Sequence, residues 1–540
     1  MTPFQPRGDE QQTVVETTGR LTVVLGGAGT GKTTTALAAA AAHLGRSRPN
    51  SIDRVLFLSF SRASVASISS RSGGVLAPYN DRIDVMTFHA LAYSIVRRFG
   101  SLIDKPGLVL VSPPRERLGA PPGSVGYKEL IPMAIAILRS SQQVKDFMQS
   151  RWSLVIVDEF QDCGDAQQEL LDELAPDARQ ILLGDPNQCI YTFLAADGVR
   201  LDRISDASKA AGTGNTIMLP DASHRDPTGV IPSVAKAIQA RDFASPAIAT
   251  AMTEGRLQVR SGIPLTDEVQ EVSAVVKALR LEGLGVAVFT HHNDMLVALS
   301  DGLEKADLEH EIVGLSDALA CALDAQVALL RYGAGGSTWD KVLDSLAVFV
   351  TSAQRGSAVP QLATDILNET GARTLQERLT TVRQSLDDAS GIRDLLSIAS
   401  GFHGAIGLSA KSNAWADASK LLSPMAARAV RSLGQGASEM SIVDNLSIAA
   451  REATYSALTD VTFSPRPIQL MNLYQTKGRE ADATVVVLRE GDFMGKESEP
   501  FPSTSRLLYV VFSRARARIV VLLVGSAFPS AVAPLATLAR

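Results

Sequence analysis

Apolar positions in the first part of the chain fall into short continuous runs, separated by longer stretches rich in helix-forming residues. The first run, LTVVL at residues 21–25, meets a glycine-rich turn and is followed by the helix-forming segment TTTALAAAAAHL. Further runs lie at residues 55–60, 153–160 and 180–185. Strands of a parallel sheet are buried on both faces and read as such runs. The pattern therefore predicts an α/β domain over residues 1–222.

A second set of apolar runs predicts a second α/β domain. These runs lie at residues 285–290, 468–474, 483–488 and 517–524. Between the first and the second of them, residues 315–450 show helical periodicity and many alanines. This stretch is expected to be a helical insertion.

A stretch rich in proline and glycine, near residues 108–126, predicts a small insertion at about residues 100–150 of the first domain. The expected fold class is α/β throughout. The expected organisation is a first lobe over residues 1–222, a second lobe formed by residues 223–314 and 451–540, and the helical insertion over residues 315–450.

The composition of the 540 residues excludes two classes of protein. A hydrophobic content of 45% with 20% charged residues is too apolar for a disordered chain. The length implies several domains and excludes a single small binding module. The formal charge is −5, from 52 basic and 57 acidic residues, so the chain has no overall positive field. Contact with nucleic acid would therefore need a local basic groove.

The three cysteines, Cys163, Cys189 and Cys321, are odd in number and lack the spacing of a metal site. Free thiols are typical of a reducing cytoplasm. No apolar run reaches the ~18 residues of a membrane span, and the first residues contain no apolar leader. We expect a cytoplasmic protein without a membrane partner.

A phosphate-binding loop is predicted between the first strand and the first long helix. Its sequence GGAGTGKT fits G-x-x-x-x-G-K-[ST], with the residues Gly26, Gly27, Ala28, Gly29, Thr30, Gly31, Lys32 and Thr33. Glycines let backbone N–H groups surround a phosphate at the positive end of the helix. Lys32 would reach the β- and γ-phosphates, and the Thr33 hydroxyl would bind Mg²⁺. An ordinary glycine turn, the alternative, does not explain Lys32 and Thr33.

Two carboxylates complete the predicted nucleotide site. In LVIVDEFQD, Asp158 directly follows four apolar strand residues and is expected to hold Mg²⁺. Glu159 can accept a proton from an attacking water, which hydrolysis requires and a small-molecule kinase does not. An acidic pair at a strand end is by itself mostly a solvated turn. Combined with the phosphate loop, it predicts a hydrolase that uses ATP and Mg²⁺.

Seven sequence blocks together resemble the UvrD/Rep/PcrA-like superfamily 1 DNA helicases. They are GGAGTGKT, MTFHAL, VDEFQD, LLGDPNQCIYTF, SHR, YQTKGREAD and RLLYVVFSRAR, in the order of that family. The resemblance covers most of the two α/β lobes but not the helical insertion. It implies a P-loop NTPase with two RecA-like parallel-sheet lobes, each with a mostly helical insertion.

The resemblance also implies roles at the nucleotide. Gln11 would read the adenine edge and Glu480 would contact the ribose. Gln188 would contact the γ-phosphate and report hydrolysis to the DNA side. Arg225 and Arg514 would present guanidinium groups to the γ-phosphate from the second lobe.

For DNA, the resemblance implies that Phe60, Tyr191 and Phe193 stack on bases and that His89 contacts the backbone. Tyr474 stands where the family has a histidine on the DNA side. Aromatic residues beside strand ends are also common in cores, and a buried structural histidine is the alternative for His89.

Several positions depart from the family pattern. His224 stands where a tyrosine usually stacks on adenine, and it would hold adenine less firmly. Leu194 replaces an arginine on the DNA side. The segment at residues 404–407 is a poor match to the motif with which the family grips duplex DNA. The sequence therefore supports ATP hydrolysis more directly than strand separation.

The expected function is an ATP-dependent DNA helicase or translocase. Single-stranded DNA and junctions with duplex would stimulate it, movement would run 3′ to 5′ as in the family, and a nuclease or repair protein is a further expected partner. One alternative is a DNA-sensing ATPase that regulates a partner nuclease, as in Gabija-type anti-phage systems. A phosphate-loop kinase is a remote alternative, because DEFQD and the two distant arginines argue against it.

Overall fold

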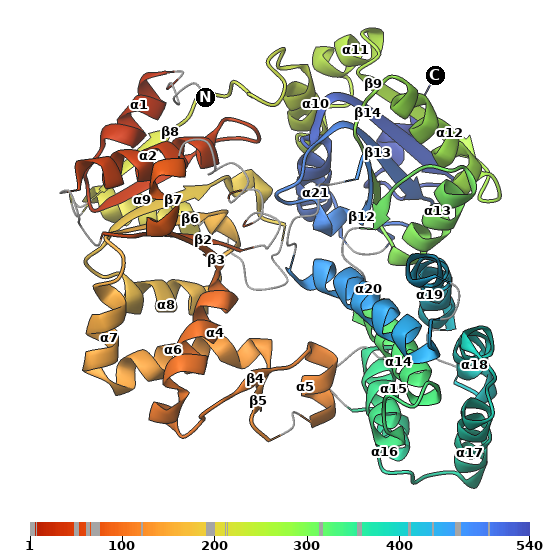
Figure 1. The fold of residues 1–540 in the computed structure, drawn as a ribbon. Helices are drawn as coiled ribbons and strands as arrows, with labels where there is room; N and C mark the ends of the chain where they lie inside the picture. Colours follow the sequence, from red (N-terminus) through yellow and green to blue (C-terminus); the bar gives the residue numbers. More distant parts are fainter. Residues whose placement is uncertain are drawn as a thin grey trace.

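The chain forms two α/β lobes, each built on a six-stranded parallel sheet, in a computed structural model (Figure 1). This α/β architecture confirms the predicted fold class. The structure describes residues 6, 8–47, 53–60, 65, 68, 76–119, 122–190, 200–210, 212, 214–312, 317–353, 359–408, 412–434, 437–459, 466–494 and 497–539.

The first sheet has the strand order β3-β2-β6-β7-β1-β8. In chain order its strands are β1 (Leu21–Leu25), β2 (Val55–Ser59), β3 (Ile83–Thr87), β6 (Leu154–Asp158), β7 (Arg179–Gly184) and β8 (Gly214–Met218). Leu25 pairs with Gly184 and Ser59 with Asp158, so the carboxyl ends of the strands form one edge. Helices of this lobe include α1 (Asp9–Glu16), α2 (Lys32–Arg46), α8 (Asp165–Leu174) and α9 (Arg200–Ala210).

A helical segment leaves the first sheet at the end of β3 and returns at the start of β6. It contains α4 (Phe88–Phe99), α5 (Pro113–Gly119), α6 (Tyr127–Ser140), α7 (Gln142–Gln149) and the short pair β4 (Val109–Leu110) and β5 (Ser124–Val125). The hydroxyl of Thr87 accepts a 3.1 Å hydrogen bond from Ala90 N and caps α4. This cap turns the chain from strand to helix, so the excursion begins before residue 100.

The second sheet has the strand order β11-β12-β10-β13-β14-β9. In chain order its strands are β9 (Leu257–Ile263), β10 (Val286–Thr290), β11 (Glu311–Ile312), β12 (Ile468–Asn472), β13 (Ala481–Arg489) and β14 (Ala515–Val524). Its helices include α10 (Val230–Gln239), α11 (Pro246–Thr253), α12 (Glu268–Leu281), α13 (Asn293–Lys305), α21 (Pro502–Phe512) and α22 (Ala533–Ala536).

A second helical segment lies between β11 and β12. Its helices are α14 (Asp317–Gly333), α15 (Trp339–Ala353), α16 (Gln361–Leu367), α17 (Arg373–Asp387), α18 (Ile392–Ala405), α19 (Ser412–Leu433) and α20 (Glu439–Thr459), so the helical part extends past residue 450. It has a core of its own, in which Trp415 stacks on Phe402 with ring centroids 5.7 Å apart. The Trp415 indole donates to Ala399 O at 3.0 Å, which satisfies its buried N–H.

The two helical segments touch each other through α5 and α15, below the sheets in Figure 1. Arg115 forms an ion pair of 2.5 Å with Asp344. Arg117 donates to Thr351 O at 2.8 Å. None of the helices within the described ranges combines the length and the apolar character needed to cross a membrane.

Candidate functional site

The glycine-rich loop between β1 and α2 has the backbone shape of a phosphate cradle. Gly29 and Gly31 adopt positive φ angles of 78° and 88°, a region that favours glycine. A Cβ atom at Gly29 would lie 2.4 Å from Ser223 Oγ. Both the backbone conformation and the close approach of Ser223 therefore require glycine at this position, and the loop opens onto the amino end of α2.

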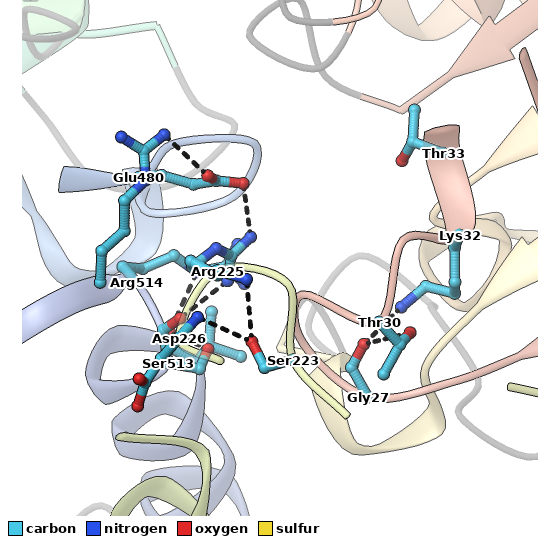
Figure 2. Close-up of polar contacts among 12 residues, drawn as sticks. Gly27, Thr30, Lys32, Thr33, Ser223, Arg225, Asp226, Glu480, Ser513 and Arg514 are labelled. Atoms are coloured by element: carbon cyan, nitrogen blue, oxygen red, sulfur yellow. Dashed lines mark hydrogen bonds and ion pairs between the residues drawn. The ribbon is translucent and has the colours of Figure 1, made fainter. Parts of the chain in front are cut away.

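Lys32 is buried and folds back onto this loop. Its Nζ donates to Gly26 O at 2.6 Å and to Gly27 O at 3.0 Å, and Thr30 Oγ1 donates to Gly27 O at 3.0 Å (Figure 2). The ammonium group is thus inside the cradle, where a phosphate oxygen could replace these carbonyl acceptors.

Thr33 and Asp158, the two predicted Mg²⁺ ligands, lie side by side. Thr33 Oγ1 donates to Asp158 Oδ2 at 3.1 Å. Neighbouring oxygens around Mg²⁺, each about 2.1 Å from an octahedral ion, are about 3 Å apart, so the pair fits this ion. Burial, followed by the charge of Glu159, raises the pKa of Asp158 to about 6.

Glu159 directly follows the strand end and has a positive φ angle of 55°. Burial opposes its ionisation, but the charges of Lys477, Lys32 and Arg514 outweigh burial, so the pKa of Glu159 is lowered. Gln161 also donates to its carboxylate. The side chain is therefore a carboxylate at neutral pH, as a general base must be.

Arg514 reaches across to the first lobe. Its Nη2 donates to Gln188 Oε1 at 2.6 Å and its Nε donates to Val510 O at 3.0 Å. Gln188 in turn donates to Asp185 Oδ2 at 2.8 Å. Burial, and secondly the charge of Arg225, lower the pKa of Arg514 to about 10, so it remains a cation at neutral pH.

Arg225 lies beside the phosphate loop and is bonded to other residues of the second lobe. Its guanidinium donates to Ser513 O and to Glu480 Oε1, both at 2.7 Å (Figure 2). Its Nε is buried and donates to no atom among the described residues. The structure places Glu480, the expected ribose contact, between two arginines, because its other oxygen pairs with Arg516 at 3.1 Å.

Gln11 and His224, the two residues expected at adenine, lie against each other. Gln11 Nε2 is 3.3 Å from His224 Nε2 and donates to Thr30 O at the same distance. The backbone N–H of His224 donates to Gly29 O at 2.8 Å. The exposed His224 ring is therefore fixed beside the phosphate loop by its own main chain.

The expected DNA-binding residues follow strand ends. Phe60 comes directly after β2, His89 lies in the first turn of α4 after β3, and Tyr474 lies directly beyond β12. All three are half-buried, and His89 packs on Tyr127 with ring centroids 5.9 Å apart. Burial, with the charge of Glu497, raises the pKa of Tyr474. Tyr191 and Phe193 lie outside the described residues.

Several polar residues that join the lobes were not predicted from the sequence. Lys477 forms an ion pair with Asp162, and both side chains are buried. Burial raises the pKa of Asp162 to about 7 against the opposing charge of Lys477. Tyr509 donates to Asp185 Oδ2 at 3.3 Å. All four lie inside the seven sequence blocks, but nothing in the sequence pairs them.

Comparisons with known proteins agree with this geometry. The AAA domain family matches residues 10–194. The ATP-dependent DNA helicase UvrD1 of Mycobacterium tuberculosis is 24% identical over 206 residues, which cover 35% of this chain and 26% of the relative.

Two further relatives match shorter segments. The RecB subunit of the RecBCD enzyme of Mycobacterium tuberculosis is 37% identical over 92 residues, 17% of this chain and 8% of the relative. A subunit of the ATP-dependent helicase/nuclease of Streptococcus sanguinis is 31% identical over 96 residues, 18% of this chain and 8% of the relative. The matched segments thus span about a quarter or less of these relatives. The sequence blocks, the two parallel-sheet lobes and these matches together support the similarity of this chain to the UvrD/Rep/PcrA-like superfamily 1 helicases.

Proposed function

We propose that this protein hydrolyses ATP between its lobes and uses the energy to move along single-stranded DNA. The observation that supports this most directly is the convergence of groups from both lobes: Arg514 bonds to Gln188, and its charge acts on Glu159. In this proposal the motor lobes comprise residues 1–222 and residues 223–314 with 451–540.

The proposed hydrolysis assigns a role to each of the residues that meet at the phosphate loop. Glu159 accepts a proton from water as the water oxygen bonds to the γ-phosphorus and the bond from that phosphorus to the bridging oxygen breaks. Lys32, Arg225 and Arg514 are cations placed to stabilise charge on the transferring group and on ADP. The hydrogen bond between Gln188 and Arg514 connects the phosphate side of the first lobe to the second lobe.

Thr33 and Asp158 would hold Mg²⁺, which when bound neutralises charge on the β- and γ-phosphate oxygens. Gln11 and His224 would bind adenine, one by hydrogen bonding and the other by stacking. Because an imidazole covers less of the base than a tyrosine ring, we expect loose discrimination among nucleotides.

Single-stranded DNA would lie across the carboxyl edges of both sheets. Phe60 and His89 follow neighbouring strands of the first sheet, and Tyr474 follows a strand of the second. Tyr191 and Phe193 would add stacking surface. Because this DNA path crosses both lobes, closure of the lobes would move the protein along the strand. The family resemblance favours movement in the 3′ to 5′ direction, with displacement of a duplex ahead of the protein.

One set of assays tests this proposal. ATPase rates are measured with and without single-stranded DNA, and strand displacement is measured on 3′-tailed and 5′-tailed duplexes. Stimulation by DNA and displacement of the 3′-tailed substrate are expected. An ATPase indifferent to DNA would contradict the proposed motor.

A second candidate function is regulation of a nuclease partner. It is favoured by the names of two relatives, one from the RecBCD enzyme and one from a helicase/nuclease. It predicts DNA-stimulated ATP hydrolysis without strand displacement, and a nuclease activity that appears only in a purified complex. Strand displacement by the purified chain alone would favour the first candidate.

A further inference from the structure

Two histidines and an aspartate meet at the carboxyl edge of the second sheet, in a place that the nucleotide chemistry does not use. His291 and His292 directly follow β10, and Asp492 follows β13. These strands are parallel neighbours, with Thr290 paired to Val487, so their ends lie together although the residues are about 200 positions apart. We propose that His291, His292 and Asp492 bind a divalent transition metal ion, zinc in the first place.

The distances among the three ligand atoms fit a tetrahedral ion. His291 Nδ1 is 3.0 Å from His292 Nε2 and 3.3 Å from Asp492 Oδ1, and His292 Nε2 is 3.2 Å from Asp492 Oδ1. Ligand atoms about 2.0–2.1 Å from Zn²⁺ at tetrahedral angles stand about 3.3 Å from one another. The three atoms thus have the spacing of one face of a zinc tetrahedron.

Hydrogen bonding alone cannot satisfy this triangle. Each ring nitrogen carries at most one proton. If both nitrogens are protonated, two N–H groups face each other along the His291–His292 side. If only one is protonated, a nitrogen lone pair faces another lone pair along one side. A cation just outside the plane of this face, at the centre of the tetrahedron, accepts a lone pair from all three atoms.

The surrounding residues hold these side chains in place. Asp492 Oδ2 accepts a 2.8 Å hydrogen bond from Arg489 N, which leaves Oδ1 toward the imidazoles. Thr290 Oγ1 donates to His292 O at 2.9 Å. Such outer contacts are typical of metal sites, where they orient the ligands.

Phe493 gives a second sign of a constrained site. It has φ +64°, an unfavourable conformation for a bulky residue, yet its side chain is buried. Its ring packs on that of His291, with centroids 4.4 Å apart. Strain of this kind persists only where the surroundings enforce it and is concentrated at functional sites. Here it places Asp492 and the His291 ring together.

Exposure determines the kind of site. His291 and Asp492 have side-chain exposures of 2% and 1%, whereas that of His292 is 52%. The ion would therefore lie between a closed protein side and solvent, with a fourth position open to water. Three protein ligands and one open position distinguish catalytic from structural zinc sites. Imidazole ligands also favour zinc over Mg²⁺, which prefers oxygen.

Metal titration of the full-length protein tests this inference. The protein is stripped with a chelator and titrated with Zn²⁺ by calorimetry, and with Co²⁺ by visible absorption, in excess Mg²⁺ and without nucleotide. Excess Mg²⁺ occupies the oxygen site at Thr33 and Asp158 but does not compete well for imidazole. We expect about one equivalent to bind, with the absorption of tetrahedral Co²⁺.

Two variants locate the binding. His292→Ala removes a half-exposed ligand, so the fold is retained. The variant should weaken zinc binding at least about tenfold, because the loss of even an outer-shell hydrogen-bond partner lowers metal affinity by about 10–100-fold. Asp492→Asn should do the same. His310→Ala, a histidine bonded to Ser300 and away from the triangle, is the matched control and should bind as the wild type does.

Thermal unfolding gives a readout independent of spectroscopy. Zn²⁺ should raise the melting temperature of the wild type and of His310→Ala but not that of His292→Ala. Absence of a tetrahedral Co²⁺ spectrum, or zinc binding of unchanged affinity in His292→Ala, would overturn the inference. Neither result bears on the proposed ATPase, because the ATP turnover of these variants is measured separately.

Discussion

Gln188 Oε1 accepts a 2.6 Å hydrogen bond from Arg514 Nη2, and this bond joins residues 326 positions apart across the two lobes. Both side chains are buried. A guanidinium that bonds directly to the amide beside the phosphate site can sense the nucleotide only while the lobes are closed. In the proposed mechanism, the charge of Arg514 would therefore be available for chemistry in a closed conformation and withdrawn in an open one.

Replacing Arg514 with alanine should therefore affect turnover more than binding. We expect DNA-stimulated ATP hydrolysis to fall by about 10³-fold, the scale of an arginine finger, with a modest change in nucleotide affinity. Arg225→Ala should behave similarly. Arg518→Ala is a suitable control, because Arg518 lies four residues further along the chain, in β14, and pairs with Glu282. Steady-state ATPase and nucleotide-binding measurements check this, and normal stimulated turnover in both variants would reject the two-lobe mechanism.

Lys32 and Glu159 should separate binding from chemistry. Lys32→Ala removes a cation from the phosphate loop and should weaken nucleotide binding. Glu159→Gln should bind Mg-ATP yet hydrolyse it at least about 10²-fold more slowly, because the base is lost. Binding is followed with a fluorescent nucleotide and hydrolysis by phosphate release. Glu169→Gln, on the surface of α8, serves as the control. Near-normal turnover in Glu159→Gln would show that another group is the base.

The requirement for Mg²⁺ should depend on pH through Asp158. Burial raises the pKa of Asp158 to about 6, so protons compete with the metal for its carboxylate below that pH. The Mg²⁺ concentration for half-maximal ATPase should be constant above pH 7. Below pH 6 it should rise as the pH falls, with a limiting slope of about tenfold per pH unit. In Asp158→Asn it should be high at every pH. A wild-type Mg²⁺ requirement that does not change between pH 5.5 and 8 would exclude Asp158 as a ligand.

Phe60 tests the DNA path. If it stacks on a base, Phe60→Ala should cost about 1–3 kcal/mol of single-strand binding, with little dependence on sequence. Binding should also weaken as salt rises, because phosphate contacts release counterions. ATPase without DNA should be unchanged. Phe147→Ala, which removes an aromatic ring that is 46% exposed, is the control. The affinity of both variants for single-stranded DNA is measured by fluorescence anisotropy. If Phe60→Ala binds DNA as tightly as the wild type does, Phe60 belongs to the core and not to the DNA path.

The strands that the sequence predicted are the interior ones of both sheets. Residues 55–59 and 154–158 are buried on both faces and therefore read as apolar runs. The four strands that gave no such signal, β3, β8, β9 and β11, are the edges of the two sheets. Strand β9 contains exposed Arg260, Ser261 and Gly262. An edge strand has one neighbour and tolerates polar residues, so periodicity alone does not reveal it.

The nucleotide half of the site was predictable because each of its parts gives a local sequence signal. Lys32 and Thr33 begin α2 directly after the phosphate loop, and Asp158 is the last residue of β6. Contacts between lobes were not predictable from pattern, because pairs such as Tyr509 with Asp185 depend on how two sheets face each other. The trio of His291, His292 and Asp492 was missed for a related reason: only the pairing of β10 with β13 brings Asp492 to the histidines.

The contact between α5 and α15 has a mechanical consequence. The lobes meet at Gln188 and Arg514, and the helical segments meet separately at Arg115 and Asp344. Further buried polar contacts also join the lobes, so the two halves of the molecule meet in two regions, the lobe contacts and the contact of α5 with α15. If the lobe contacts break while the ion pair at Arg115 holds, that ion pair becomes a pivot and the helical segments become lever arms. A small rotation at α5 would then separate the nucleotide-site residues of the two lobes by a much larger displacement.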